Sequence, residues 1–468
     1  MLPHIDVLVT GNLNIIPDFR YEYGKAYLFA GELEKATQLL QAVLEYRKNT
    51  LGDNHPDTLA AMHWVAWLYK NLGKFQEAEE LGILVVTKRR DVLGEHHPAT
   101  VESTGDLAVV LSRLGKLREA EELNVAVLKT RRCILGEAHP DTVTTMSNLA
   151  TTYNRLGRLQ EAKGLNLEVL RRRRKILGET HPDTLLAMLN LATTYRRLGR
   201  LQEAEGLNLE VLQRWRKILG ETHPDTLLTM SSLALTYSKL GRLQEAEALD
   251  LEVLERQRKI LGHNHPDTLL SMANLALTYH HLGRFREAEV LAVAVLQQHK
   301  SSLGENHPET MRTMSNLAAT YSRLERLQEA EDLESVVLDK RRGILGANHP
   351  DTLRSMGNLA VTYNKLGRFL EAETLLVEAL KKQKDALGNN HPTTLRTQSN
   401  LGSTLNKLER WQEAEDLLVP VLEKQKDLLS HSHPHIMDTI NSLAITYTKL
   451  GKLKEAEDMN EALGRLEV

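Results

Sequence analysis

The chain has 468 residues, 41% of them hydrophobic, and its 59 lysine and arginine residues nearly balance 62 aspartate and glutamate residues, leaving a formal net charge of −3. One hydrophobic core would not serve a chain of this length, whereas a repeated unit needs only its neighbours. The balanced charge and the aromatic content of 4% argue against nucleic acid as a partner, because phosphate binding needs excess positive charge and base stacking needs aromatic side chains.

The cysteine content and the hydropathy pattern indicate in which cellular compartment the protein is expected and whether it associates with a membrane. The single cysteine, Cys133, excludes an intrachain disulfide. A large chain with one thiol and no secretory leader is typical of a reducing compartment, so we expect a cytoplasmic protein. No apolar run approaches the roughly 20 residues that a membrane span requires, so we expect no membrane association.

The N-terminal part of the chain predicts a weak first repeat. An apolar stretch, Leu2–Val9, lies in the segment of residues 1–14, which we interpret as either the remnant of a preceding domain or a helix that caps the repeats. Residues 15–54 form a degenerate repeat, because Tyr27, Gly31 and Ala36 each precede a residue of the same type by 42 positions.

A strict internal period follows. The dipeptide His-Pro occurs ten times at intervals of 42 residues, beginning at residues 55, 97, 139, 181, 223, 265, 307, 349, 391 and 433. This period predicts nine units over residues 55–432 and a capping repeat over 433–468, whose last helix is more polar. We expect about eleven helical hairpins in total, the first of them atypical.

The unit that starts at His139 shows how each hairpin is encoded. Pro140 and Asp141 suit the start of a helix, since proline fits the first helical position and an acidic residue complements the helix dipole. Gly157 ends this first helix, a second begins near Leu159, and Gly178 ends the unit. Both helices carry an apolar stripe at helical spacing, which consecutive units must bury against each other. The predicted fold is therefore all-α, an α-solenoid superhelix of tandem helix–turn–helix repeats.

Two units depart from the pattern. Glu325 and Glu409 stand where the other units have the glycine that ends the first helix. A left-handed backbone there should cost up to about 1 kcal/mol each for a residue other than glycine.

The pattern L-A-x-x-Y-x-x-L-G-R-x-x-E-A-E, as in Leu233–Glu247, resembles the tetratricopeptide repeat. The 42-residue form, with L-G-x-x-H-P-D-T between units, resembles the repeats of kinesin light chains and the C-terminal repeats of fungal NLR-like proteins, which carry an NB-ARC or NACHT module upstream. The resemblance implies a scaffold that binds a protein or an extended peptide in its concave groove, without catalysis or cofactor. The chain contains no G-x-x-x-x-G-K-[ST] motif, so it is interpreted as a fragment of such a receptor or as a free-standing adaptor.

Two sets of residues on the predicted first helices are candidates for partner binding. An asparagine recurs on the side opposite the apolar stripe, at Asn148, Asn190, Asn274, Asn316, Asn358 and Asn400. Its amide can pair with both N–H and C=O of an extended backbone. Three consecutive units add an arginine four residues earlier, at Arg312, Arg354 and Arg396. This spacing places each pair on one helix face and resembles a carboxylate clamp, which predicts an acidic partner.

Structural roles compete with these interpretations. The asparagines could instead hold neighbouring helices together. Further basic residues lie near the ends of the first helices, and we expect them to complement helix dipoles more than to bind: Arg155, Arg197, Lys239, Arg323, Lys365 and Lys407. Of these, Arg155 and Arg197 are retained as candidates for partner binding.

Other functions find less support in the sequence. The His-Pro histidines lie a whole repeat apart, so we assign them to helix starts and expect no metal site. No catalytic motif occurs, and we expect no enzymatic activity. The alternatives to a receptor tail are a kinesin-light-chain-like cargo adaptor and a self-associating structural solenoid, although we favour a monomer.

Overall fold

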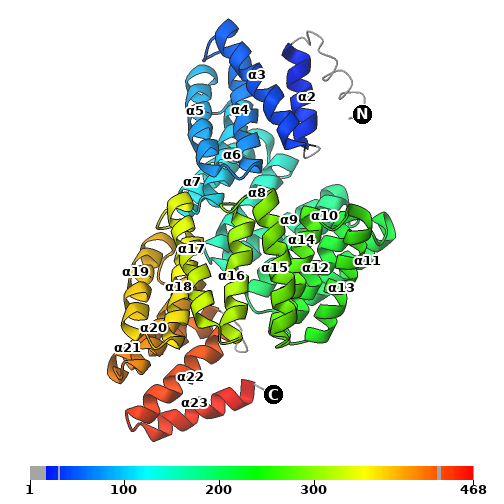
Figure 1. The fold of residues 1–468 in the computed structure, drawn as a ribbon. Helices are drawn as coiled ribbons and strands as arrows, with labels where there is room; N and C mark the ends of the chain where they lie inside the picture. The colour runs from blue at the N-terminus through cyan, green and yellow to red at the C-terminus, as the bar shows by residue number, and fades with distance from the viewer. Residues whose placement is uncertain (1–16, 30–31, 429–433, 467–468) are drawn as a thin grey trace. The chain divides into compact units, whose positions relative to one another are not determined.

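The computed structural model describes residues 17–29, 32–428 and 434–466, so the predicted N-terminal segment 1–14 and the last His-Pro histidine lie outside the described residues. Within this part the chain is entirely helical, with 22 helices that form eleven consecutive pairs (Figure 1). The helices group into two compact units, residues 1–152 and 153–468. We call these two groups of helices unit 1 and unit 2, as distinct from the 42-residue repeat units, and describe each by itself.

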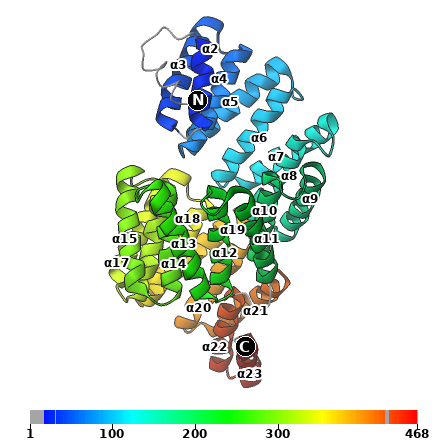
Figure 2. The same ribbon diagram turned by 90° about the vertical axis from the view of Figure 1, so that its right-hand side faces the viewer.

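Unit 1 contains α2 (Pro17–Phe29), α3 (Leu33–Leu51), α4 (Pro56–Asn71), α5 (Phe75–Leu93), α6 (Pro98–Arg113) and α7 (Leu117–Leu135), while α8 (Pro140–Arg155) contains the division between the units. Unit 2 continues with α9 (Leu159–Leu177), α10 (Pro182–Arg197), α11 (Leu201–Leu219), α12 (Pro224–Lys239), α13 (Leu243–Leu261), α14 (Pro266–His281), α15 (Phe285–Ser302), α16 (Pro308–Arg323), α17 (Leu327–Leu345), α18 (Pro350–Lys365), α19 (Phe369–Leu387), α20 (Pro392–Lys407), α21 (Trp411–Leu428), α22 (Pro434–Lys449) and α23 (Leu453–Leu466). Consecutive helices pack on each other from α2 to α7 in unit 1 and from α9 to α23 in unit 2, as α10 to α15 show in Figure 2.

The first helix of each pair from α4 to α22 begins at the proline of His-Pro, as predicted. The preceding histidine is the N-cap residue: at α10, the Asp183 N–H donates to His181 Nδ1 at 3.2 Å. The same bond occurs at all nine His-Pro histidines that the structure describes. Each histidine therefore satisfies one of the otherwise unpaired N–H groups at a helix start.

The turn within each pair uses a left-handed residue. Gly157, between α8 and α9, has a φ of 75°. Glu325 and Glu409 occupy the same place with φ of 60° and 61°, so these two repeats keep the left-handed turn without glycine. The backbone bond that closes the turn also survives, since the Arg326 N–H donates to Tyr321 O at 3.0 Å.

The core runs between the two helices of each pair and on to the next pair. Ala192 in α10 and Ala204 in α11 are buried, and these small side chains allow the helices to approach closely. Larger apolar residues fill the space around them, including Met188 and Trp215, which is the largest fully buried side chain. Each helix pair therefore depends on its neighbours for burial, as expected of a solenoid.

A buried polar ladder, which we define by threonines of the first helices, joins successive pairs. Thr194 Oγ1 accepts hydrogen bonds from Asn154 Nδ2 (2.8 Å) on α8 and Asn166 Nδ2 (2.9 Å) on α9. Related bonds join Asn124 to Thr152, Asn208 to Thr236, Asp250 to Thr278 and Glu334 to Thr362. These hydrogen bonds favour one rotation of each helix against the next, because a buried amide donor without a partner is costly.

Two members of this ladder are acids where other units have asparagine. Thr278 Oγ1 donates to Asp250 at 2.6 Å, and Thr362 Oγ1 donates to Glu334 at 2.7 Å. Burial raises the pKa of Asp250 to about 6, and burial raises the pKa of Glu334 to about 7. These two carboxyl groups therefore bind their protons more tightly in the folded chain than they would when exposed to water.

Candidate partner-binding surface

The predicted asparagines lie on the first helices and leave their amides unused. The backbone carbonyls of Asn190, Asn316 and Asn400 accept hydrogen bonds from threonines of the polar ladder. Among the described residues, the side-chain amides of the six predicted asparagines form no hydrogen bond with the chain. Asn148 belongs to unit 1, and the other five belong to unit 2. We call the five positions in unit 2 the asparagine row: Asn190, Asn274, Asn316, Asn358 and Asn400.

Other asparagines make the contacts between neighbouring helices. Asn364 Nδ2 donates to Thr404 Oγ1 at 2.8 Å, and Asn406 Nδ2 donates to Ser442 O at 3.0 Å. The members of the asparagine row are instead half-buried, with Asn190 exposed. Their donors and acceptors are thus accessible to another chain, as an extended backbone would require.

The three predicted arginines differ in how far their charge is neutralised. Arg312 forms an ion pair with Glu309, and Arg354 Nη2 lies 2.9 Å from Asp351 Oδ1. Both acids lie on the same helix as the arginine, three residues earlier, and exposed pairs of this kind contribute little. Arg396 has no ion pair within the described part of the chain.

The electrostatics of Arg396 show a local excess of positive charge. Burial lowers the pKa of Arg396, and the nearby charge of Arg354 lowers it further. Two cations therefore lie close together on α18 and α20 without a matching pair of acids. An added carboxylate would relieve this repulsion.

The basic residues at the ends of the first helices make several contacts inside the chain. Arg197 Nη1 donates to Asn154 O at 2.5 Å, and Lys365 Nζ donates to Ser322 O at 3.2 Å. In both cases a cation satisfies a carbonyl near the end of the preceding first helix, which is the dipole-related role expected from the sequence. Lys239 differs, because its pKa is lowered by burial and by the charge of Arg196.

Arg155 lies at a contact within unit 2 between segments far apart in the sequence. His391 Nε2 donates to Arg155 O at 2.9 Å. Burial lowers the pKa of His391 to about 4, so this ring is neutral near pH 7. A Cβ on Gly157 would lie 2.6 Å from Pro392 Cδ, so the close approach also requires glycine at that turn.

A hollow of about 450 Å³ lies beside the asparagine row. Its lining comes from α12, the end of α13, α14 and α16, and combines apolar and polar groups. Leu228, Leu235 and Leu270 contribute apolar surface, while Asn274 and Arg312 contribute polar groups. The structure thus brings two sequence-predicted residues, Asn274 and Arg312, into one site.

The leucines of this hollow were not among the residues predicted from the sequence to bind a partner. Leu228 and Leu270 occupy, in their units, the position that Arg312 occupies in a later one. Aligning the units would have revealed this equivalence. Hydrophobicity alone does not, because it assigns a leucine on a helix to the core.

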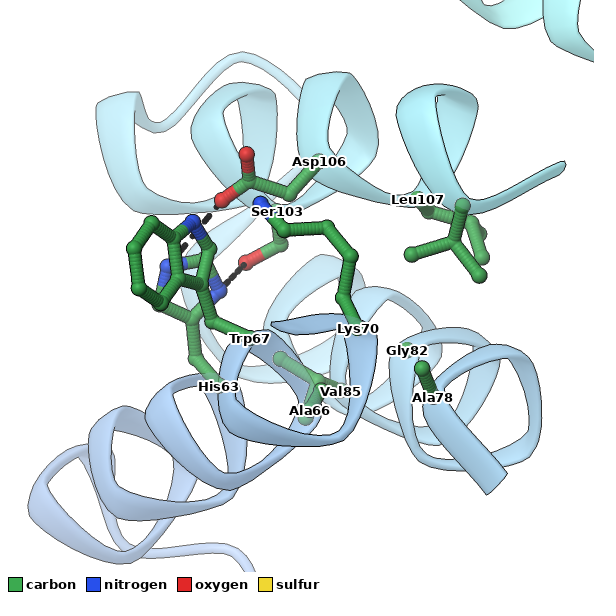
Figure 3. A pocket seen from close by; sticks show the side chains of 11 residues that line it. His63, Ala66, Trp67, Lys70, Ala78, Gly82, Val85, Ser103, Asp106 and Leu107 are labelled. Carbon is green, nitrogen blue, oxygen red and sulfur yellow. Dashed lines mark hydrogen bonds and ion pairs between the residues drawn. The ribbon is translucent and has the colours of Figure 1, made fainter. Parts of the chain in front are cut away.

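Unit 1 contains a small polar pocket of a different kind (Figure 3). His63 Nε2 lies 3.3 Å from Asp106 Oδ2, and its Nδ1 lies 3.4 Å from Ser103 Oγ. Burial lowers the pKa of His63 to about 3, and the charges of Arg89 and Lys70 act in the same direction.

This serine, histidine and aspartate do not form a nucleophilic site. Ser103 Oγ donates its only proton to Ala99 O at 2.9 Å, and it accepts a hydrogen bond from Arg89 Nη1. The cavity measures about 20 Å³, which is room for about one water. We therefore interpret the cluster as a buried polar contact between α4, α5 and α6.

Metal-binding clusters and membrane-spanning helices are absent from the described parts of the chain. No group of three or more histidines, cysteines, aspartates and glutamates could hold a metal ion there. Cys133 is exposed. Across the same residues, every helix is too short or too polar to cross a membrane.

Tandem helix pairs with a polar, unengaged first-helix surface define a helical-repeat protein. Models of the tetratricopeptide repeat match residues 19–83, 141–214, 184–255, 232–292, 274–342, 337–385, 357–427 and 393–463, and also 100–141. The chain belongs to the tetratricopeptide repeat family, as the sequence resemblance indicated.

Solved structures of repeat proteins are similar to the chain. Nearly identical TPR-like repeats of a kinesin light chain from Podosopora anserina are 32% identical over 44% of this chain and 97% of theirs, with a TM-score of 0.37. The apo form of the quorum sensor NprR from B. thuringiensis is 17% identical over 72% of this chain and 92% of its own, with a TM-score of 0.52. The latter likeness concerns the fold alone. No curated protein matches the chain.

Proposed function

We propose that the chain is a non-catalytic scaffold that binds an extended segment of a partner protein along the asparagine row. The observation that carries the proposal is the set of unengaged amides repeated on the first helices α10, α14, α16, α18 and α20, with Ser232 at the same position of α12. A backbone laid across these helices can pair with one amide after another, which gives affinity without demanding a particular sequence. The nearby arginines favour a partner with acidic residues.

A peptide array probed with the purified chain tests this proposal. Substitution of Asn316, Asn358 and Asn400 by alanine should weaken peptide binding at least tenfold while the helix content stays unchanged. The matched control replaces Asn264, Asn348 and Asn390, which are exposed in the turns before first helices of unit 2, also by alanine. Equal binding by both triple variants would contradict the proposal.

The biological setting is proposed on the pattern of the repeats. The 42-residue units with near-identical neighbours favour the ligand-sensing tail of an NLR-like receptor, in which partner binding would act on an upstream ATPase module. A kinesin-light-chain-like adaptor is the second candidate, favoured by the similarity of its repeats. The gene sequence upstream of this chain distinguishes them, because the first requires a nucleotide-binding module and the second a heptad coiled coil.

A self-associating solenoid is a further alternative, and light scattering tests it. A molar mass that stays at one chain, 52.8 kDa, across concentration supports the scaffold proposal. A mass that rises with concentration would favour self-association.

A further inference from the structure

One position on the first helices changes its chemistry along unit 2. It lies four residues before each asparagine of the asparagine row, and before Ser232 in α12, and we call it the preceding row. Its members from α10 to α20 are Leu186, Leu228, Leu270, Arg312, Arg354 and Arg396. Three apolar residues are thus followed by three cationic ones at intervals of one unit. Because helix pairs with leucine and with arginine share one fold, neither residue type is needed for folding there.

The leucine half of this row presents apolar surface to solvent. The exposed fractions of Leu186, Leu228 and Leu270 are 36%, 53% and 38%. Leu228 and Leu270 also line the hollow of about 450 Å³, together with Ile260 from the end of α13. A cavity of this volume accommodates a large apolar side chain.

The arginine half carries charge that the chain does not fully neutralise. Glu309 and Asp351 pair with the first two arginines, but the equivalent residue before Arg396 is Thr393. The Nε atom of Arg312 is buried and has no hydrogen-bond partner within the described residues. Arg312 also belongs to the lining of the hollow, so the apolar half and the cationic half meet there.

We infer that the partner is an extended segment with an apolar half and an acidic half. The apolar side chains lie against the leucines of α10, α12 and α14, and the carboxylates lie against the arginines of α16, α18 and α20. This inference rests on the proposed function and adds the composition and order of the segment. The α12 helix contacts both α10 and α14, so the axes of neighbouring first helices lie about 10 Å apart. An extended chain rises about 3.3 Å per residue, which assigns about three residues of the partner to each unit.

Synthetic peptides of about 18 residues test the inference directly. The first peptide has leucines in its N-terminal half and glutamates in its C-terminal half, and the second has the two halves in reverse order. The third has glutamates throughout and the fourth has leucines throughout. Serine is the spacer residue in all four. Binding is measured by fluorescence anisotropy with the full chain. One of the two mixed peptides should bind at least tenfold tighter than either uniform peptide.

Paired variants assign the halves of the peptide to the halves of the row. Leu228→Gln with Leu270→Gln should weaken the mixed peptide at least fivefold and leave the glutamate peptide unchanged. Arg354→Gln with Arg396→Gln should weaken both peptides and flatten their salt dependence. The leucine control is Leu209→Gln with Leu251→Gln, because these leucines are 44% and 43% exposed on second helices. The arginine control is Arg258→Gln with Arg342→Gln, also on second helices.

The outcomes separate this inference from the proposed function. If the glutamate peptide binds as tightly as the mixed ones, and the Leu228/Leu270 variant binds like its control, the two-part segment is refuted. The asparagine triple variant then still tests the scaffold proposal. If no peptide binds, or if binding survives loss of the asparagine row, the proposed function fails as well.

Discussion

The buried carboxyl group of Glu334 makes the stability of unit 2 depend on pH. Its side chain accepts a hydrogen bond from Thr362 and is only 6% exposed. Burial raises its pKa from the ordinary 4.5 to about 7. Each pKa unit corresponds to about 1.4 kcal/mol, so the ionised form costs the folded state roughly 3 kcal/mol relative to the unfolded chain.

The sign of the effect follows from which state holds the proton more tightly. Below about pH 4.5 the carboxyl group is protonated in both states, and the cost is absent. As the pH rises toward 7, the unfolded chain ionises first, and stability is lost progressively until the folded-state pKa is passed. Glu334→Gln keeps the size and polarity of the side chain without a titrating group. It should therefore be more stable than the parent by roughly 3 kcal/mol at pH 8 and nearly equal at pH 4.5.

Hydrogen exchange provides the assay, because a repeat protein can open locally rather than in one global step. Protection of amides in α17 and α18 should fall in the parent between pH 4.5 and 8, after correction for intrinsic exchange, and should stay level in Glu334→Gln. The control is Asp339→Asn, an exposed acid on the same helix. A parent and a Glu334→Gln variant with the same corrected pH dependence would refute the reasoning.

Three further predictions concern the fold. Asp250→Asn should remove a loss of stability between about pH 4 and 6, visible as exchange in α13 and α14, since burial raises that pKa to about 6. Glu325→Gly and Glu409→Gly should each stabilise the chain by up to about 1 kcal/mol in thermal melts, because both residues have positive φ; unchanged or lower melting temperatures would count against strain at these turns. Thr194→Val should cost about 1–3 kcal/mol in urea unfolding, because it removes the acceptor of two buried amides; a neutral effect would show that the polar ladder contributes little.

The helix bounds were predictable because local signals specify them. Proline at the first helical position and glycine in the turn act within a few residues, and the 42-residue period repeats both signals. The predicted start of a second helix near Leu159 is the start of α9. The equivalents of Glu325 in other repeats are glycines, and the structure keeps the left-handed turn at Glu325 as well.

The polar ladder and the apolar hollow were not predictable in the same way. The bond from Asn166 to Thr194 joins residues 28 apart, and the bond from Asn154 to Thr194 joins residues 40 apart. Each depends on how one helix is rotated against another, which periodicity does not report. The exposure of Leu228 could not be predicted for the same reason. Which leucines of a helix are buried depends on where the neighbouring helix packs.

Repetition itself separates residues that build the fold from residues that recognise a partner. The His-Pro cap, the turn glycine and the ladder threonine recur because every pair must stack on the next. Stacking of the helix pairs does not require a particular residue at a position that changes from leucine to arginine while the helices around it stay the same. Drift would scatter residue types along such a position, whereas the preceding row of unit 2 groups three leucines and then three arginines. Duplication of single units could copy a residue to its neighbour, but Leu228, Leu270 and Arg312 also line one hollow together with Asn274 of the asparagine row. The inferred partner, with one apolar and one acidic half, accounts for both the grouping and its place.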